Sequence, residues 1–265
     1  MRGMKSRMVV ALGIIVVAFV IIVAGLAGPA VARAAAAPRK PFQVTWLGHA
    51  AFEITSPGGT RLLIDPFLKD NAKTPEAFKD LSRYKPNAIL VTHSHPDHAS
   101  DAAAIATSSG APVISAYEWV GGLDIPEKQK LGGNVGGAFV VGDVTVHIVP
   151  AMHSSGPSGR PVGFVLSFPD GRSLYHTGDT WIFGDMALIQ EIYHPNVILL
   201  NVGGGYYGAD PKTAALAIKK YFTPDAIVPM HFATFPGLAT DADVATAFKG
   251  DARLVVMTPG QTKAF

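Results

Sequence analysis

Three histidines and one aspartate lie within six consecutive positions, in the stretch VTHSHPDH at residues 91–98. The chain has nine histidines in 265 residues, so a third of them fall in this stretch. Imidazole and carboxylate groups are ligands of divalent transition metals, and they need polar partners wherever they are buried. The spacing therefore predicts a metal site formed by His93, His95, Asp97 and His98.

The element before this cluster explains how its side chains converge. The apolar run NAILV at 87–91 predicts a strand, and alternate side chains of an extended chain point the same way. His93, His95 and Asp97 can then face one side, and His98 follows where a helix begins. One ion cannot use four ligands from so short a segment, so we expect two neighbouring ions with further ligands from distant segments.

Three residues elsewhere in the chain are candidates for those further ligands. Each comes just after a predicted strand, and they are His153 in PAMHSS, Asp179 in YHTGDTW and His231 in VPMHFAT.

From residue 41 onward the chain has the pattern of a single α/β domain, at 41–265. Apolar runs rich in β-branched residues, first in hairpins and then alternating with helical patterns, predict two sheets covered by helices, a four-layer αββα sandwich. The Gly- and Pro-containing stretch 118–137 is expected to be loop, and RLVVM at 253–257 is expected to be the final strand.

Residues 1–40 have the pattern of a signal peptide or membrane anchor followed by an Ala/Pro linker. A basic start, MRGMKSR, precedes an uncharged apolar stretch at 8–27 that is long enough to span a bilayer. Cleavage and membrane anchoring through 8–27 both remain open. Either one predicts an exported protein, periplasmic or extracellular, with its C-terminal domain outside.

The charge and cysteine counts exclude several classes of site and partner. Without Arg2, Lys5 and Arg7, 19 basic residues face 20 acidic ones, and no run of Lys or Arg elsewhere suggests a nucleic-acid partner. The chain has no cysteine, which excludes disulfides and thiolate ligands.

VTHSHPDH resembles the H-x-H-x-D-H signature of the metallo-β-lactamase superfamily, and the order His153, Asp179, His231 follows that superfamily's pattern. Four segments resemble one branch of it, the uncharacterised metal-dependent hydrolases related to ascorbate-6-phosphate lactonase. They are WLGHAAFEI at 46–54, LIDPFL at 63–68, YHTGDT at 175–180 and PMHFATFPGL at 229–238. The resemblance covers residues 42 to about 262 and implies the fold of that superfamily. The loop VGGGYYGADP at 202–211 departs from the Gly-Gly-x-Phe-Thr-Met type of many relatives.

The resemblance also implies how the ligands divide between two divalent metal ions. His93, His95 and His153 would hold the first ion; Asp97, His98 and His231 would hold the second, with Asp179 bridging them. Zinc is the first choice of metal, with manganese or iron as alternatives.

The function implied is hydrolysis of a small ester, lactone, amide or phosphoester by a hydroxide shared between the two ions. Asp97, His231 and His49 are the candidate catalytic residues. The expected partner is a small-molecule substrate, and relatives suggest a homo-oligomer. The alternatives are an iron-dependent redox enzyme on the same fold, a diiron reductase or sulfur dioxygenase, and a non-catalytic metal-binding protein.

Several residues keep two interpretations. His49 is either near the reaction or a turn residue. Asp65 either supports the metal site or is a strand-end turn residue, and His176 either supports Asp179 or only packs. Arg160 either binds an anionic substrate group or is a solvated loop residue, and the loop 203–208, with four glycines and two tyrosines, either approaches the site or only turns. His147 on a strand and His194 at a helix end are not expected to act, and they are the only other histidines.

Overall fold

The computed structural model describes residues 40–156 and 158–265, and within them the strands form two sheets. The larger sheet has seven strands in the order β13-β1-β2-β3-β4-β5-β6. Its strands are β1 (Gln43–Gly48), β2 (Ala51–Thr55), β3 (Arg61–Ile64), β4 (Ala88–Leu90), β5 (Val113–Ala116), β6 (Lys130–Gly133) and β13 (Thr262–Ala264). Strands β3 to β6 pair in parallel, and β13, β1, β2 and β3 pair antiparallel.

The second sheet has six strands in the order β12-β11-β10-β9-β8-β7. Its strands are β7 (Ala138–Val141), β8 (Val144–Pro150), β9 (Val162–Ser167), β10 (Ser173–His176), β11 (Val197–Asn201) and β12 (Ala226–Met230). Strands β10, β11 and β12 are parallel, and β7 to β10 form an antiparallel meander.

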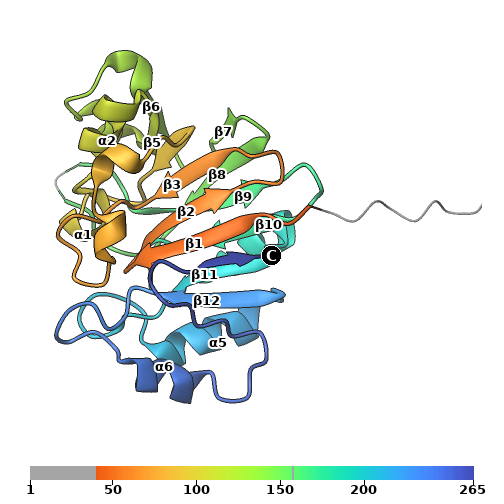
Figure 1. Ribbon diagram of the computed structural model, residues 1–265. Helices are drawn as coiled ribbons and strands as arrows, with labels where there is room; N and C mark the ends of the chain where they lie inside the picture. The colour runs from red at the N-terminus through yellow and green to blue at the C-terminus, as the bar shows by residue number, and fades with distance from the viewer. Residues whose placement is uncertain (1–39, 157) are drawn as a thin grey trace, which may run out of the picture. The chain divides into compact units, whose positions relative to one another are not determined.

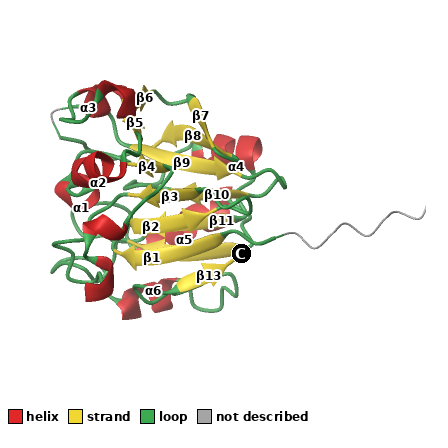
Figure 2. Ribbon diagram, turned by 45° about the horizontal axis from the view of Figure 1, so that its top comes forward, coloured by secondary structure: helices red, strands yellow, loops and turns green. Residues whose placement is uncertain are grey.

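Helices cover the outer face of each sheet, as Figures 1 and 2 show. One apolar cluster joins the outer face of the larger sheet to the first helices, α1 (Pro96–Ala99), α2 (Ala102–Ser109) and α3 (Tyr117–Gly121). A second cluster fills the space between the sheets and reaches the later helices, α4 (Met186–Tyr193), α5 (Pro211–Tyr221) and α6 (Asp241–Ala247). The short 3₁₀ helices are η1 (Glu76–Phe78), η2 (Leu81–Arg83) and η3 (Glu127–Gln129). The predicted four-layer αββα sandwich is confirmed.

The ends of the helices follow from the sequence. Asp210 caps α5 by accepting hydrogen bonds from the backbone N–H groups of Lys212 and Thr213, and Pro211 occupies the first turn, where its missing N–H costs nothing. Helix α2 ends at Gly110, whose φ of 77° is a left-handed conformation that glycine adopts readily.

Two predicted elements are wrong. The stretch 118–137 is not all loop, because it contains most of α3 and the strand β6, which pairs in parallel with β5. A Cβ atom at Gly132 would lie 2.9 Å from the Tyr117 Cα atom, so the glycine that suggested a loop lets α3 pack closely on β6. RLVVM at 253–257 makes only an isolated bridge, Ile227 with Leu254. The final strand is the exposed β13, which pairs with β1.

The predicted localisation is contradicted. In residues 40–156 and 158–265, no helix combines the length and the apolar character needed to cross a membrane. The stretch 8–27, on which export and anchoring were predicted, lies outside the described residues. We therefore do not retain export or membrane anchoring. The division of the chain near residue 40 stays a prediction.

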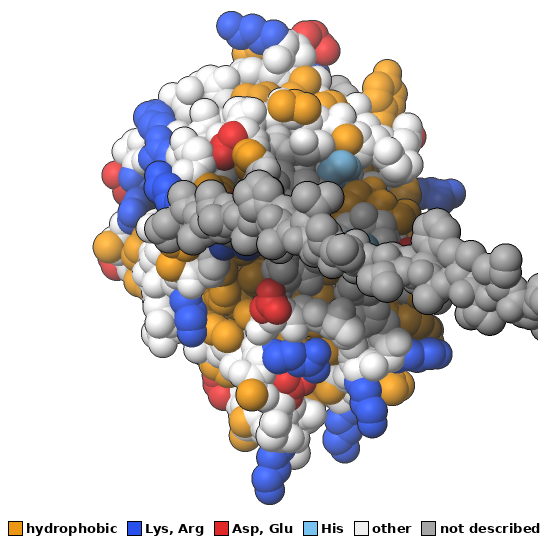
Figure 3. Space-filling model, turned by 90° about the vertical axis from the view of Figure 1, so that its right-hand side faces the viewer, with side chains coloured by type: hydrophobic (Ala, Val, Ile, Leu, Met, Phe, Trp, Pro, Cys, Tyr) orange, Lys and Arg blue, Asp and Glu red, His pale blue; other side chains and the backbone are white. Residues whose placement is uncertain are grey.

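Charged side chains are dispersed over the part of the surface visible in Figure 3. Lys and Arg side chains stand singly or in small groups there, with Asp and Glu side chains between them. This face therefore presents mixed charge in its visible part.

Candidate metal centre

Every predicted ligand follows a strand whose carboxyl end points to the same edge of the molecule. In the larger sheet, β1, β3 and β4 run in one direction, and they lead to His49, Asp65 and the 93–98 cluster. In the second sheet, β8, β10, β11 and β12 share a direction, and the first, second and fourth lead to His153, Asp179 and His231. Side chains more than 180 residues apart thus converge at one place.

Three histidines form the first set of candidate metal ligands, called the first ligand set below. The ligand atoms of His93, His95 and His153 all lie within 4.8 Å of one another. His93 Nε2 is 2.9 Å from His95 Nδ1, and the ring of His153 stands nearly perpendicular to both, with centroids 5.1 and 5.2 Å away. These are the residues that the superfamily resemblance assigned to the first ion.

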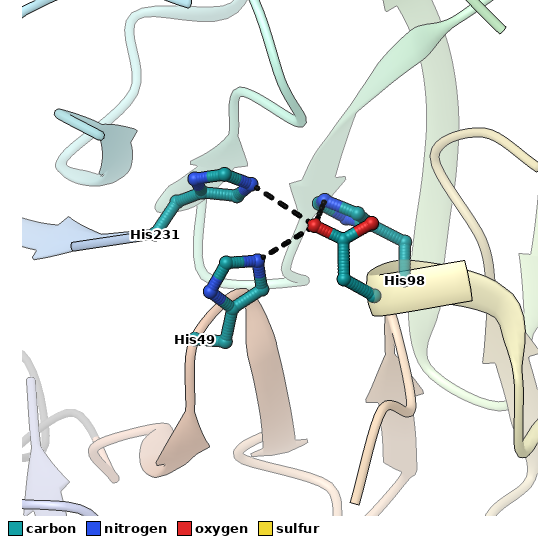
Figure 4. A group of neighbouring side chains, drawn as sticks. His49, His98 and His231 are labelled. Carbon is teal, nitrogen blue, oxygen red and sulfur yellow. Dashed lines mark hydrogen bonds and ion pairs between the residues drawn. The ribbon is translucent and has the colours of Figure 1, made fainter. Parts of the chain in front are cut away.

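The second set surrounds one oxygen of Asp97. Its Oδ2 atom lies 3.1 Å from His49 Nε2, 3.6 Å from His231 Nε2 and 3.9 Å from His98 Nε2. The three histidines come from different elements, the turn after β1, helix α1 and the end of β12 (Figure 4). His49 is therefore a possible fourth ligand of this set, in addition to the three residues predicted for it.

Asp179 lies between the two sets. Its Oδ2 atom is 2.9 Å from His231 Nε2 and 3.6 Å from His153 Nε2, and its Oδ1 atom is 3.4 Å from His98 Nε2. The carboxylate thus contacts ligands of both sets, as a bridging ligand must.

Asn201, at the end of β11, holds this carboxylate in place. Its amide nitrogen donates to Asp179 Oδ1 at 2.6 Å, and its oxygen accepts from the backbone N–H of Gly203 at 3.2 Å. Sequence reasoning missed Asn201. The only available signal was a lone polar residue ending an apolar strand, NVILLN at 196–201, as the ligands do elsewhere.

Asp65 contacts candidate ligands of both sets, directly or through Thr92, so it is more than a strand-end turn residue. Its Oδ2 atom accepts hydrogen bonds from His98 Nδ1 at 2.8 Å and from the Thr92 hydroxyl at 2.7 Å, and its Oδ1 atom accepts from the Thr92 backbone N–H at 2.7 Å. The Thr92 hydroxyl oxygen is also 3.0 Å from His93 Nδ1. Asp65 is fully buried and has a positive φ of 45°, so the surrounding structure must hold this unusual backbone conformation.

Thr234 gives His49 a defined orientation. Its hydroxyl lies 3.0 Å from His49 Nδ1, while His49 Nε2 faces Asp97. An ionised carboxylate only accepts, so we assign the ring proton to Nε2. Nδ1 then accepts from the Thr234 hydroxyl, which shares its one hydrogen with the Phe232 carbonyl 3.2 Å away. His49 thus contacts the site and is not only a turn residue.

The electrostatics of the site favour a cation. Burial is the strongest single influence on His231 and would lower its pKa, but the charge of Asp179 and the close contacts with Asp179 and Asp97 together raise that pKa to about 9. Burial also opposes charge on His98, whose pKa is nevertheless raised by Asp179 and Asp65. Burial would raise the pKa of Asp179, yet the neighbouring His231 and His98 hold it well below its usual value.

Two other histidines are kept neutral. Burial, with the nearby His231, lowers the pKa of His49 to about 4, and burial with the nearby His98 lowers the pKa of His93. Neutral His93 has a lone pair for a metal ion, whereas neutral His49, with its proton assigned to Nε2, donates to Asp97.

The unsatisfied atoms of the site fit metal ions. His98 Nε2 and both ring nitrogens of His231 are buried and make no hydrogen bond. His231 Nε2 is 2.9 Å from Asp179 but outside hydrogen-bonding geometry. A buried polar atom without a partner is costly, and the Nε2 atoms of His98 and His231 face the carboxylates of Asp97 and Asp179. The donor set of nitrogen and oxygen is one that zinc, manganese and iron all accept.

A pocket of about 240 Å³ opens over both sets. It is lined by His95, Pro96, Asp97, His153, Asp179, Tyr207, His231, Phe235, Pro236 and Leu238. Arg160 is not in this lining. It borders a separate cavity, together with Glu118 and Asn134. Tyr206 is 96% exposed and also lies outside the lining, whereas Tyr207 belongs to it.

The remaining sequence interpretations are resolved as follows. His176 Nδ1 accepts a hydrogen bond from the backbone N–H of Gly178, and its Nε2 atom lies 3.0 Å from the Ala50 carbonyl oxygen. His176 thus holds the backbone next to Asp179. It makes no hydrogen bond with the Asp179 carboxylate. Gly203 permits close approach to a ligand, because a Cβ atom there would lie 2.6 Å from His231 Nδ1.

The two histidines that were not expected to act lie away from the ligands. His147 lies in strand β8 and packs on Tyr193 of helix α4. His194 follows the last residue of α4 and has a left-handed backbone conformation.

Comparison with known proteins places this arrangement in a family. The β-lactamase superfamily domain matches residues 43–231, which is more than half of the chain. The UPF0173 metal-dependent hydrolase of Anaeromyxobacter sp. (strain K) is 42% identical over 245 residues, 86% of this chain and 89% of that protein. The chain belongs to the β-lactamase superfamily, and within it to the relatives named UPF0173 metal-dependent hydrolases. The resemblance found in the sequence is confirmed.

Solved structures agree with this assignment. The metallo hydrolase Igni18 of the archaeon Ignicoccus hospitalis has a TM-score of 0.74 and 35% identity, and the match covers 85% of this chain and 98% of that one. An isothiocyanate hydrolase from Delia radicum gut bacteria has a TM-score of 0.66 over 84% of this chain and 98% of that one. Because the two sequences are only 18% identical, this likeness shows that they share a fold and nothing more.

Proposed function

We propose that this protein is a binuclear metal-dependent hydrolase that cleaves a small ester, lactone, amide or phosphoester. The observation that carries the proposal is the pair of ligand sets joined by Asp179, which contacts His153 on one side and His231 on the other. Membership in a superfamily whose relatives are named metal-dependent hydrolases supports it.

The protein residues would hold the ions and handle the proton. Two bound divalent ions would lower the pKa of water to about 7 and polarise the scissile bond. Asp97 lines the pocket and its side chain is 29% exposed, so it can take the proton of the attacking water and return it to the leaving group. His49 orients Asp97 through its Nε2–H group, and His231 faces both carboxylates.

The metals and partners follow from the same observations. The nitrogen and oxygen donors suit zinc, manganese and iron alike, and the preference for zinc, which assumed an exported protein, is not retained. A pocket of about 240 Å³ supports a small-molecule substrate. The absence of a nucleic-acid partner and the formation of a homo-oligomer stay predictions. Hydrolysis of β-lactams does not follow from the fold, because one fold hosts many substrates.

A hydrolysis screen with a matched variant tests the proposal. Esters, lactones, phosphodiesters and β-lactams are offered to wild type and to His95→Ala, which lacks one ligand of the first set. Turnover by wild type that the variant loses supports metal-based hydrolysis. Equal turnover by both proteins for every substrate contradicts it.

Metal analysis of the purified protein separates the alternative functions. About two zinc or manganese ions per chain fit the hydrolase. Iron as the metal would favour the redox alternative, and a protein that holds metal but turns over no substrate would favour the non-catalytic one.

A further inference from the structure

The pocket above the ligand sets has one polar wall and one apolar wall. The polar wall consists of the metal-ligand candidates His95, Asp97, His153, Asp179 and His231. The apolar wall consists of Tyr207, Phe235, Pro236 and Leu238. A substrate whose scissile bond faces the ligands must place its remaining atoms against the apolar wall.

Aromatic contacts hold the apolar wall in position. The Phe235 ring lies 5.3 Å from the His49 ring in an edge-on arrangement and 6.1 Å from the Phe67 ring. The side chains of Phe235 and Tyr207 remain 39% and 52% exposed, although such large rings gain from burial. The uncovered parts of these rings offer a surface for an apolar group.

The two loops that carry these side chains are packed on each other. The Ala239 backbone N–H donates to the Gly203 carbonyl at 2.8 Å, and a Cβ atom at Gly205 would lie 2.5 Å from the Gly237 carbonyl oxygen. Gly205 also has a φ of 64°, which glycine adopts without strain. The apolar wall is therefore preformed, which lowers the entropic cost of binding.

The apolar wall disfavours an anionic group in the part of the substrate that lies against it. No Lys or Arg is among the described residues that line the pocket, and Arg160 borders the separate cavity. Proteins hold carboxylate and phosphate groups mainly with arginine, lysine or backbone N–H groups. Charge at the scissile bond would face the bound ions, but a carboxylate against Tyr207, Phe235 and Leu238 would lose water without gaining such a partner.

The volume limits the size of the substrate. Pockets for drug-sized ligands have about 300–1,000 Å³. The volume here, about 240 Å³, is smaller, so it suits a single ring or a short branched chain beside the scissile bond.

We propose that the substrate is a small ester or lactone whose part away from the scissile bond is an uncharged aromatic or branched alkyl group held by Phe235, Tyr207 and Leu238. This inference rests on the proposed hydrolase function and narrows it.

Matched esters test the inference on the full-length, metal-loaded protein. Phenyl acetate and 3-carboxyphenyl acetate share the scissile bond and differ by one carboxylate. We expect kcat/KM to favour phenyl acetate by about tenfold or more, the equivalent of about 1.4 kcal/mol. Phe235→Ala and Tyr207→Ala should each lower kcat/KM for phenyl acetate by about tenfold, mainly through KM, because aromatic contacts contribute energies of this order.

Tyr206 provides the matched control, since it neighbours Tyr207 but is 96% exposed and outside the pocket lining. Tyr206→Ala should stay within about twofold of wild type, as most surface substitutions do. A preference for the carboxylated ester overturns the inference. So does an unchanged KM in Phe235→Ala, or an equal loss in the Tyr206 and Tyr207 variants.

Binding of the matched amides, which hydrolyse far more slowly than aryl esters, separates failure of this inference from failure of the hydrolase proposal. In NMR titrations, acetanilide should bind more tightly than 3-acetamidobenzoate, and Phe235→Ala should weaken acetanilide binding. Tighter binding of the benzoate contradicts the apolar pocket, whatever the turnover. If acetanilide binds as expected but neither ester is hydrolysed faster than by His95→Ala, the pocket inference holds and the hydrolase proposal fails for these esters.

Discussion

Replacing Asp65 by asparagine tests whether one buried carboxylate determines which ring nitrogen carries the proton in His93 and His98. Asp65 Oδ2 accepts the Nδ1–H group of His98 and the hydroxyl hydrogen of Thr92. The Thr92 oxygen must then accept from His93 Nδ1, 3.0 Å away. With metal bound, this assignment leaves Nε2 of both His93 and His98 unprotonated and free to ligate.

The asparagine keeps the shape of the side chain but introduces a donor. With its NH₂ group toward the Thr92 backbone N–H, two donors face each other. In the opposite orientation the NH₂ group meets His98 Nδ1, and the His98 proton must move to Nε2, where it blocks the metal. Loss of such a supporting partner typically costs about 10–100-fold in metal affinity. That factor is about 1.4–2.8 kcal/mol for each ion.

Calorimetric zinc titration of metal-free protein measures the effect. Wild type should bind two ions, and Asp65→Asn should bind both about 10–100-fold more weakly. Thr92→Val should weaken only the ion held by His93, because His98 keeps its carboxylate partner.

Asp143→Asn is the control for the change in charge. Asp143 also accepts hydrogen bonds from Ser56, Gly58 and Thr60, but it contacts no ligand residue. This variant should bind zinc as wild type does. Circular dichroism verifies that each variant is folded. Wild-type affinity for both ions in a folded Asp65→Asn protein would refute the reasoning about ring protons.

Three further predictions concern protons and packing. His231, with its pKa raised to about 9, is protonated at pH 7. Zinc binding should therefore release a proton, and the zinc affinity should rise as the pH rises toward 9. Binding heats that do not vary between phosphate and Tris buffers would contradict this. His49 and His93 have folded-state pKa values below their unfolded value of about 6.5, so their contribution to stability is present above that pH and is lost as the pH falls toward about 4. Urea unfolding of metal-free protein should therefore show lower stability at pH 5 than at pH 7, and equal stability would count against neutral buried histidines. In Gly203→Ala, the added Cβ atom would lie 2.5 Å from the His231 carbonyl oxygen, so we expect His231 to be displaced. Binding of the second ion should weaken about tenfold or more in the same calorimetric titration. Unchanged affinity would show that the loop 203–208 moves to accept the side chain.

Much of the site could be predicted from the sequence because its signals are local. His93, His95, Asp97 and His98 are close in space simply because they are close along the chain. The order of apolar strands and helical patterns also predicted the layered fold.

Other features depend on packing between distant segments. Asn201 holds Asp179 because parallel strands β10 and β11 end side by side, and no residue spacing encodes that contact. Strand β13 is short and exposed, and it counts as a strand only because β1 provides its hydrogen-bonding partner. The apolar run at 253–257 lacks such a strand partner and makes only one bridge.

The sequence by itself determined the metal-binding chemistry and the αββα architecture, since residue type and period decide which groups can ligate and which faces must be buried. Only the tertiary structure decided that His49 and Asp65 contact the ligands, that Arg160 borders another cavity, and that Phe235 faces the site. The physical reason is that these placements follow from where the ends of separate strands and loops meet, which sheet pairing and core packing determine across long stretches of chain.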